Sequence, residues 1–256
     1  MNLNLKNKVV IVTGASRGIG KAIALGFAVE GTKLSICGRT PETLESAVNE
    51  IQALGEEVFA KPTDVTHSTQ AEAFVKATLD KYGCIDVLVN NVGGSRKTPT
   101  LEISDEEWHD LLDLNAISAA RMSRLVIPTM KQQGGGVILM ISSIYGRESG
   151  GHITYNAGKA AEISIAKSLA MELAPYNIRV NSVAPGSTMF PGGSWERKQK
   201  ADPTKIAAFI KSDLPFGRFG RPEEIANVVV FLASERASLV TGACINVDGC
   251  QSRSNI

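Results

Sequence analysis

The chain has 256 residues, 43% hydrophobic and 21% charged, which is the composition of an ordinary folded domain and excludes a disordered tail. Lys and Arg number 27 and Asp and Glu 26, so the net charge is +1, and the strongly basic balance typical of a nucleic-acid partner is absent. No apolar run approaches the roughly 20 residues of a membrane span, and the N-terminus carries no signal peptide. We therefore expect a cytoplasmic protein without a membrane partner.

Short apolar runs alternate along the chain with longer stretches of helical spacing. Strands are predicted at 9–13, 33–37, 57–60, 85–90, 137–142, 178–183 and 244–247. Helices are predicted at 20–30, 41–54, 68–82, 104–132, 154–173 and 222–234. Apolar strands separated by helices indicate a parallel sheet covered on both faces. The predicted fold class is α/β, a single Rossmann-type doubly wound domain of about seven strands over residues 1–256.

The segment 185–221 is rich in Pro, Gly and charge, and within it only a short helix near 203–211 is predicted. A long irregular segment in a compact domain is usually functional or mobile, so we expect a substrate-capping lid at about 187–220. Residues 196–205 hold four basic and two acidic side chains. A basic lid would suit an anionic or thioester-linked substrate, although a solvated charged loop explains the composition equally well.

The first predicted strand runs directly into a glycine-rich turn, Gly14-Ala15-Ser16-Arg17-Gly18-Ile19-Gly20. Glycines at a strand-to-helix turn let the backbone approach a pyrophosphate, which the free N–H groups of the helix then bind. A P-loop is excluded, because it would need Gly at Ala15 and Ser or Thr at Ala22.

The end of the second strand indicates which nicotinamide cofactor is preferred. An NAD-binding site usually has a carboxylate there, but Gly38 occupies the position and Arg39 follows. Arg39 and Arg17 together would bind a 2′-phosphate through charge-assisted hydrogen bonds. The sequence thus predicts a preference for NADP(H), with NAD(H) still open, whereas two solvated surface arginines are the plain alternative.

Tyr155 and Lys159 lie four residues apart on a predicted helix and therefore share one face. A free phenol has a pKa of about 10, and a nearby ammonium favours the phenolate. Such a pair can act as general acid in carbonyl reduction and general base in alcohol oxidation. A Tyr and a Lys with this spacing are common in helices, so the pair indicates catalysis only together with the glycine turn upstream.

The spacing Gly14-x-x-x-Gly18-x-Gly20 resembles the TGxxxGxG turn of the short-chain dehydrogenase/reductase family. Further motifs similar to those of the family follow in order: Asn90-Asn91-Val92-Gly93, Asn115, Ile141-Ser142-Ser143, Tyr155-x-x-x-Lys159, Asn181-Ser182-Val183 with Pro185-Gly186, and Val247-Asp248-Gly249. The resemblance covers the whole chain. It departs from the family at Phe190, where PGxxxT has Thr, and at Cys250, where VDGG has its last Gly.

The resemblance implies a catalytic set of Asn115, Ser143, Tyr155 and Lys159. Read from the strand, Ser143 matches the catalytic serine, but the usual gap counted back from Tyr155 gives Ser142. We favour Ser143, because strand register is stiffer than loop length. In the family the Asn kinks its helix and positions a water for proton relay, and the Lys also holds the nicotinamide ribose.

The resemblance also implies contacts to the cofactor. Asp64 would hold the adenine, although a turn or N-cap role is equally good, and Asn90 and Gly93 would line the cleft. The carboxamide contact falls to Thr188 or to backbone, since Phe190 replaces the usual Thr. The expected cofactor-binding residues are Gly14, Ser16, Arg17, Gly18, Ile19, Gly20, Arg39, Asp64, Val65, Asn91, Gly93, Tyr155, Lys159, Pro185, Gly186 and Thr188.

The function implied is an NADP(H)-dependent oxidoreductase that interconverts a small-molecule carbonyl and a secondary alcohol by hydride transfer. Reduction of 3-oxoacyl-carrier-protein or 3-oxoacyl-CoA is one specific alternative. A nucleotide-binding regulatory or scaffold protein without turnover is an alternative of another class, which the intact catalytic set disfavours.

The sequence also bears on metal binding, on hydrolase chemistry and on the oligomeric state. No metal site is expected, because the four Cys and three His lack ligand spacing. A Ser-His-Asp hydrolase is disfavoured because no G-x-S-x-G elbow occurs. The helices at 104–132 and 154–173 carry more apolar surface than one sheet face needs, and the family pairs these helices between subunits. A homodimer or homotetramer is therefore expected.

Overall fold

The computed structural model describes residues 2–255 and contains one seven-stranded, wholly parallel sheet. The strand order is β3-β2-β1-β4-β5-β6-β7. The strands are β1 (Val9–Thr13), β2 (Lys33–Gly38), β3 (Val58–Pro62), β4 (Val87–Asn90), β5 (Gly136–Ile141), β6 (Ile178–Pro185) and β7 (Cys244–Val247). The predicted doubly wound α/β fold is confirmed, and each predicted strand is present with shifts of a few residues at its ends.

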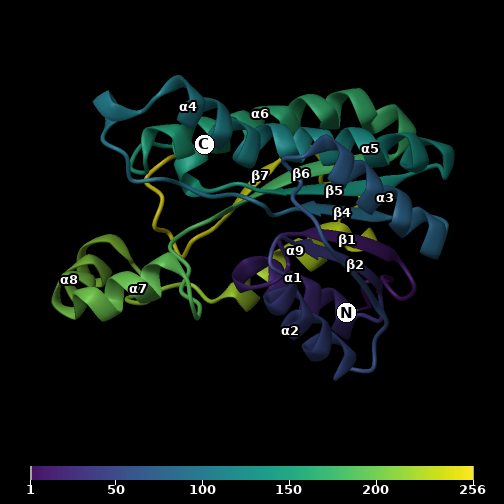
Figure 1. Cartoon of the computed structure of the whole chain (residues 1–256), viewed down its shortest axis with the longest axis horizontal. Helices are drawn as coiled ribbons and strands as arrows, with labels where there is room; N and C mark the ends of the chain where they lie inside the picture. The colour runs from purple at the N-terminus through teal and green to yellow at the C-terminus, as the bar shows by residue number, and fades with distance from the viewer. Residues whose placement is uncertain (1, 256) are drawn as a thin grey trace.

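Helices cover both faces of the sheet, as Figure 1 shows. On one face lie α1 (Gly18–Val29), α2 (Pro41–Gln52) and α9 (Pro222–Ala233). On the other lie α3 (Ser68–Tyr82), α4 (Asp105–Leu112), α5 (Ser118–Gln132) and α6 (Ile153–Leu173). The central strands β1 and β4 are buried along their whole length, because neither face of the sheet meets water.

The strand order reverses between β1 and β4, since the chain leaves β1 toward β2 and returns to the other side at β4. The connections on either side of this point run in opposite directions, which opens a crevice at the carboxyl ends of the strands. The loops after β1, β4, β5 and β6 meet there. The topology thus places the glycine turn and the serine, tyrosine and lysine motifs at one edge of the sheet.

The helix predicted as one unit over 104–132 is interrupted, which corrects the sequence interpretation. Between α4 and α5 the backbone forms a π-helical turn, Asp113–Ile117, with Asn115 at its centre. A π-turn inserts one residue into the helical repeat and frees a backbone carbonyl, and such turns are frequent at functional sites. Here the Leu111 carbonyl accepts a hydrogen bond from Nδ2 of Asn115 at 2.8 Å.

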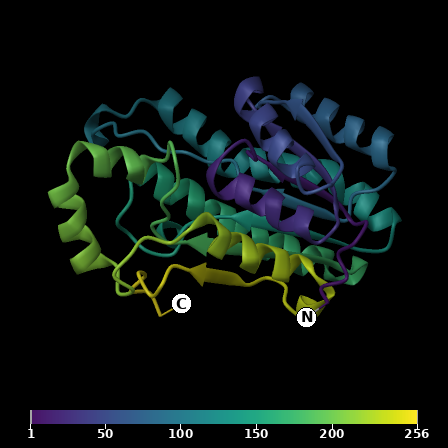
Figure 2. The ribbon, with the colours of Figure 1, turned by 90° about the horizontal axis from the view of Figure 1, so that it is seen from below.

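The segment expected to be irregular apart from one short helix near 203–211 contains that helix and a second one before it, and the second helix is a further correction. The segment contains α7 (Ser194–Ala201) and α8 (Pro203–Asp213), and Figures 1 and 2 show both helices at one end of the molecule, on the left in each view. An apolar cluster separate from the main core holds this unit together. In it the ring of Trp195 stacks on Phe209 at 4.6 Å and contacts Phe219 at 5.0 Å between centroids.

Candidate active site

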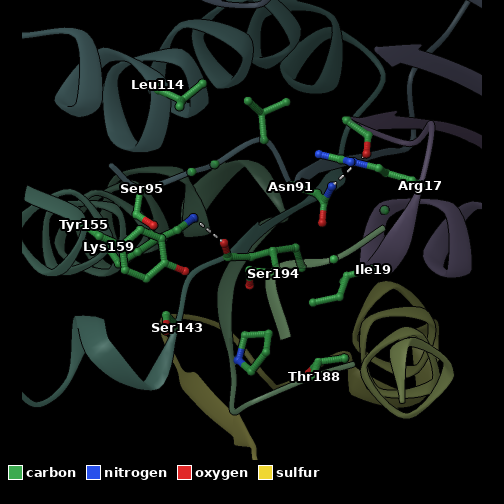
Figure 3. A pocket seen from close by; sticks show the side chains of 18 of the residues that line it. Arg17, Ile19, Asn91, Ser95, Leu114, Ser143, Tyr155, Lys159, Thr188 and Ser194 are labelled. Carbon is green, nitrogen blue, oxygen red and sulfur yellow. Dashed lines mark hydrogen bonds between the residues drawn. The ribbon is translucent and has the colours of Figure 1, made fainter. Parts of the chain in front are cut away.

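A cleft of about 1190 Å³ lies along the carboxyl ends of the strands. In Figure 3, Tyr155, Lys159 and Ser143 occupy one end of it, and Arg17 and Asn91 occupy the other. The volume exceeds the several hundred Å³ of a typical small-ligand pocket and suits an extended ligand. Every residue that the sequence predicted for cofactor binding or catalysis, apart from Asn115, Gly18 and the buried Asn90, lines this cleft.

The glycine turn after β1 has the conformation that a phosphate cradle requires. Gly14 and Gly18 have φ of 63° and 57°, in the left-handed region that side chains other than glycine rarely adopt. A Cβ on Gly20 would collide with the Gly14 carbonyl and the Asn91 amide. The first turn of α1 begins at Gly18, so its N–H groups face the cleft without intrahelical partners.

Cationic and hydroxyl groups surround the place where β2 ends. Ser16 packs against Gly38: a Cβ on that glycine would lie 3.2 Å from the Ser16 hydroxyl oxygen. Arg17 and Arg39 are exposed and line the cleft, and neither forms an ion pair with another described residue. Two guanidinium groups and a hydroxyl thus face the cleft where a 2′-phosphate would be held.

The carboxylate of Asp64 is partly engaged in a local turn. Its Oδ1 accepts hydrogen bonds from the backbone N–H of Thr66 at 3.0 Å and from the Thr66 hydroxyl at 2.7 Å. Although partial burial opposes it, these hydrogen bonds and the Arg39 charge lower the pKa of Asp64. The turn role that the sequence left open is therefore present, and the residue still lines the cleft.

The two asparagines after β4 have different roles. The amide of Asn91 donates to the carbonyl oxygens of Thr13 and Gly14 at 3.0 and 3.2 Å, so it fixes the glycine turn to β4. Asn90 points away from the cleft, because its amide donates to the Ser123 hydroxyl at 3.2 Å. The expectation that Asn90 lines the cofactor cleft is wrong, since successive side chains of a strand face opposite sides of the sheet.

Tyr155 and Lys159 lie on the first turns of α6, and the Lys159 Nζ lies 6.0 Å from the centroid of the Tyr155 ring. The Lys159 side chain is buried, and its ammonium donates to the Ile141 carbonyl at 2.7 Å and to Glu162 Oε2 at 2.8 Å. Although burial opposes it, the charges of Glu162 and Tyr155 raise the pKa of Lys159. The lysine therefore remains an ammonium beside the phenol.

The two candidate serines differ in what their hydroxyls contact. Ser142 donates to the backbone carbonyl of Lys159 at 2.9 Å, so its proton is committed to joining β5 to α6. Among the described residues, the Ser143 hydroxyl oxygen accepts a hydrogen bond from the Tyr145 N–H at 3.2 Å and donates none, so its proton is available to a ligand. Figure 3 shows Ser143 at the same end of the cleft as Tyr155. These contacts favour Ser143 as the group that polarises a substrate carbonyl.

Asn115 lies behind the cleft, fully buried in the π-turn. Its Oδ1 accepts from the Gly94 N–H at 3.0 Å, and its Nδ2 donates to the Gly94 carbonyl at 2.8 Å. A Cβ on Gly93 would lie 2.9 Å from Asn115 Oδ1 and 3.0 Å from Lys159 Nζ, so the three groups are in close contact. The asparagine amide thus fixes the loop after β4 against α6.

The turn after β6 forms the far wall of the cleft. Thr188 donates its hydroxyl to the Gly186 carbonyl at 3.2 Å, and its backbone forms a bridge with Gly220. Phe190, which replaces the threonine of the family motif, packs over the glycine turn: a Cβ on Gly18 would lie 2.6 Å from its ring. Thr188 and Phe190 thus both line the cleft at this turn.

Basic side chains from two segments line the cleft. Arg96 and Lys97 lie in the loop after β4, and Arg197 and Lys198 lie on α7. Partial burial, together with the nearby charges of Lys97 and Lys205, lowers the pKa of Lys198. The ammonium of Lys198 also lies 3.9 Å from the centroid of the Trp195 ring. The charge of Arg96 is offset by Asp110, which also lines the cleft and lies 3.0 Å from its guanidinium.

Two residues near the site were missed by the sequence analysis. Glu162, the partner of Lys159, could have been noticed as a lone carboxylate on the inward face of a helix. Gln251 binds both the backbone N–H and the hydroxyl of Ser187, at 2.7 and 3.0 Å, and so fixes the C-terminal segment to the wall of the cleft. No spacing rule marks Gln251, because the contact joins residues far apart in the chain.

The described residues were also searched for other kinds of site. None of the helices within 2–255 is long and apolar enough to cross a membrane. Within the same residues, no group of three or more His, Cys, Asp or Glu side chains is arranged to hold a metal ion.

Residues 14–250 match a family model described as enoyl-(acyl carrier protein) reductase. The 3-oxoacyl-[acyl-carrier-protein] reductase FabG of Thermotoga maritima is 39% identical over 248 residues, covering 96% of this chain and 98% of the relative. A structure of L-sorbose reductase from Gluconobacter frateurii complexed with NADPH and L-sorbose superposes with a TM-score of 0.93 at 33% identity, covering 99% of this chain and 100% of the other. A 7α-hydroxysteroid dehydrogenase complexed with NADH and 7-oxo glycochenodeoxycholic acid superposes with a TM-score of 0.91 at 33% identity, covering 99% and 97%.

The chain therefore belongs to the short-chain dehydrogenase/reductase family of oxidoreductases. The residues in the cleft fit a nicotinamide dinucleotide, because the left-handed glycines, the free N–H groups of α1 and the paired arginines form a cradle for phosphates. One of the two neighbouring structures holds NADPH and the other NADH.

Proposed function

We propose that this chain is an NADP(H)-dependent oxidoreductase that interconverts a carbonyl compound and a secondary alcohol, with Tyr155 as the general acid and base. The observation that carries the proposal is the convergence of Tyr155, Lys159 and the free hydroxyl of Ser143 at one end of a cleft whose other end is a phosphate cradle. This arrangement is unnecessary for a protein that only senses a nucleotide.

The residues of the chain divide the proton chemistry among themselves. A bound nicotinamide cofactor supplies or accepts the hydride at the substrate carbon. In reduction, Tyr155 gives its proton to the carbonyl oxygen, and in oxidation it takes the proton back. Ser143 donates a hydrogen bond to the same oxygen and stabilises the charge that develops there. The ammonium of Lys159 stabilises the phenolate that remains on Tyr155.

Basic residues that line the cleft support an anionic or thioester-linked carbonyl substrate. Lys97 and Lys198 would meet a carboxylate or phosphate remote from the reacting carbon. Reduction of a 3-oxoacyl thioester fits this charge and the name of the relative from Thermotoga maritima. It is therefore the specific substrate class that we favour.

A screen of carbonyl compounds tests the proposal directly. NADPH absorbance would be followed with acetoacetyl-CoA, L-sorbose and 7-oxo glycochenodeoxycholic acid, and we expect turnover of at least one, with the lowest KM for an anionic member. Tight binding of NADPH without oxidation in the presence of any carbonyl would instead support a nucleotide-binding scaffold.

Substitution of Arg39 by Asp should reverse the preference between the two cofactors. The carboxylate would repel the 2′-phosphate and accept hydrogen bonds from a ribose 2′-hydroxyl. Loss of one charge-assisted contact, at about 1.5–3 kcal/mol, lowers kcat/KM for NADPH by about 10- to 100-fold, while kcat/KM for NADH is kept or increased. Lys6→Asp, the same charge reversal at an exposed residue outside the cleft, is the matched control. An unmoved ratio in Arg39→Asp would overturn the assignment of NADP(H).

We also propose that the chain forms a homodimer or homotetramer through the face of α5 and α6. Ile117, which precedes α5, is 50% exposed, and Met171 of α6 is 73% exposed. Side chains of this kind exposed on the outer helices support an interface with a second copy of the chain.

A further inference from the structure

The inward face of α6 carries a second charged residue besides Lys159. Glu162 lies three residues further along the helix and seven after Tyr155, so the three side chains form one stripe. Glu162 is fully buried, and its Oε2 lies 2.8 Å from the Lys159 Nζ. Its other oxygen, Oε1, is buried and has no hydrogen-bond partner within residues 2–255.

A buried carboxylate with one unpaired oxygen is costly, and an ion pair offsets that cost only in part. Desolvation raises the pKa of Glu162 even though Lys159 acts in the opposite direction. The carboxyl group therefore takes up and releases its proton at higher pH than an exposed glutamate. Lys159 lies between Glu162 and Tyr155, so the charge of Glu162 acts on the ammonium beside the phenol.

Few other charges face Glu162. From β7, the Cys244 thiol is close enough to interact electrostatically with the carboxylate. Arg147 approaches the same strand and donates to the Cys244 carbonyl at 2.8 Å. On α6 itself, Lys159 forms the only ion pair of Glu162 among the described residues, and Tyr155 lies beyond it. The charge of Glu162 therefore acts mainly on Lys159 and, beyond it, on Tyr155.

We propose that Glu162 is a positioning residue that holds the ammonium of Lys159 against the end of β5 and offsets its charge, so that Tyr155 retains its proton for delivery to a carbonyl. The ammonium is held by two fixed acceptors, the Ile141 carbonyl and Glu162. When Glu162 is ionised, the ion pair has no net charge and stabilises a phenolate less than a lone ammonium does. The inference rests on the proposed function and names a residue that tunes its acid.

The decisive experiment is an ultraviolet titration of tyrosinate in Glu162→Gln. The chain has four tyrosines, so the signal of Tyr155 has to be isolated by difference. For the variant, the titration of Glu162→Gln/Tyr155→Phe is subtracted from that of Glu162→Gln. For the wild-type chain, the titration of Tyr155→Phe is subtracted. Gln keeps the shape and an oxygen acceptor for Lys159 but removes the negative charge. Removing one charge at this range should move the titration of Tyr155 to lower pH by about one unit.

The pH profile of turnover gives a second readout. The general base for oxidation is the ionised phenol, and the general acid for reduction is the neutral phenol. In Glu162→Gln, the limbs of the oxidation and reduction profiles should therefore move to lower pH by about the same amount as the Tyr155 titration. The two proteins should converge at low pH, because Glu162 is then protonated and neutral. In the wild-type chain, coupling also makes the limb shallower than a single ionisation.

Two further variants separate this role from a structural one. Glu172→Gln removes the same charge from an exposed residue of α6 and should leave the titration unmoved. Glu162→Asp retains the charge and should restore most of the wild-type profile. Should Glu162→Gln fail to fold, Glu162→Met removes the charge within a similar volume. The slope of the pH profile of turnover in the wild-type chain is a further test that needs no substitution.

Several results would overturn the inference. They are an unmoved Tyr155 titration in Glu162→Gln, a loss of kcat that is equal at all pH values, or a wild-type limb as steep as one ionisation. The ultraviolet titration needs no substrate, so absence of turnover with every carbonyl would contradict the proposed function and leave this test intact.

Discussion

Replacing Tyr155 by Phe is expected to lower kcat by about 10³-fold, within the range of about 10²–10⁴-fold that general acid–base catalysis contributes. The substitution removes only the hydroxyl, which supplies the proton to the carbonyl oxygen. The aromatic ring and the helix that carries it remain, and Lys159 keeps its contacts with Ile141 and Glu162. The measurement is the single-turnover rate with saturating NADPH and the best carbonyl from the screen.

Binding and stability provide the controls for Tyr155→Phe. The dissociation constant of NADPH, measured by fluorescence, should change little, because the phosphate cradle lies at the other end of the cleft. Tyr176→Phe makes the same chemical change at an exposed tyrosine outside the cleft and should keep wild-type kcat. Undiminished turnover in Tyr155→Phe would refute the assigned acid.

The sheet was predictable because each strand is a short apolar run bounded by turn residues. Residues 9–13 form an apolar run that is typical of a central parallel strand, and all five are buried. The glycine turn was equally readable, since positive φ at Gly14 and Gly18 is a conformation that glycine adopts without strain. Local sequence therefore determines the strands and the phosphate cradle.

The π-turn and helix α7 could not be predicted from local pattern, whereas α8 corresponds to the short helix predicted near 203–211. The π-turn is fixed by contacts of Asn115 with Gly94, a loop residue remote in sequence. Half of the residues of helix α7 are charged, and the helix is anchored by the packing of Trp195 on Phe209 and Phe219. Tertiary contacts rather than helical periodicity stabilise both elements, so their signals are absent from the sequence.

The assignment of the catalytic serine illustrates the same limit. Two counts along the sequence gave Ser142 and Ser143, and only the direction of each side chain separates them. Adjacent residues leaving a strand face opposite sides, so one hydroxyl reaches α6 and the other the cleft. The contact of Ser142 with the Lys159 carbonyl reflects that alternation.

Replacing Ser143 by Ala should therefore lower kcat by about 10²- to 10³-fold, the loss typical of removing one donor to a developing oxyanion. Ser143→Thr, which retains a hydroxyl, should recover part of that activity. Cofactor binding should be unaffected, because the hydroxyl acts on the substrate oxygen and lies away from the glycine turn. Steady-state kinetics in both directions would measure the effect.

Ser142→Ala should have the opposite signature. The Lys159 carbonyl would lose its buried donor, which costs about 1–3 kcal/mol of unfolding free energy and lowers the Tm, while kcat changes only a few-fold. Thermal unfolding and kinetics measured on both variants distinguish the two serines. If Ser142→Ala abolished turnover at an unchanged Tm while Ser143→Ala remained active, the roles would have to be exchanged.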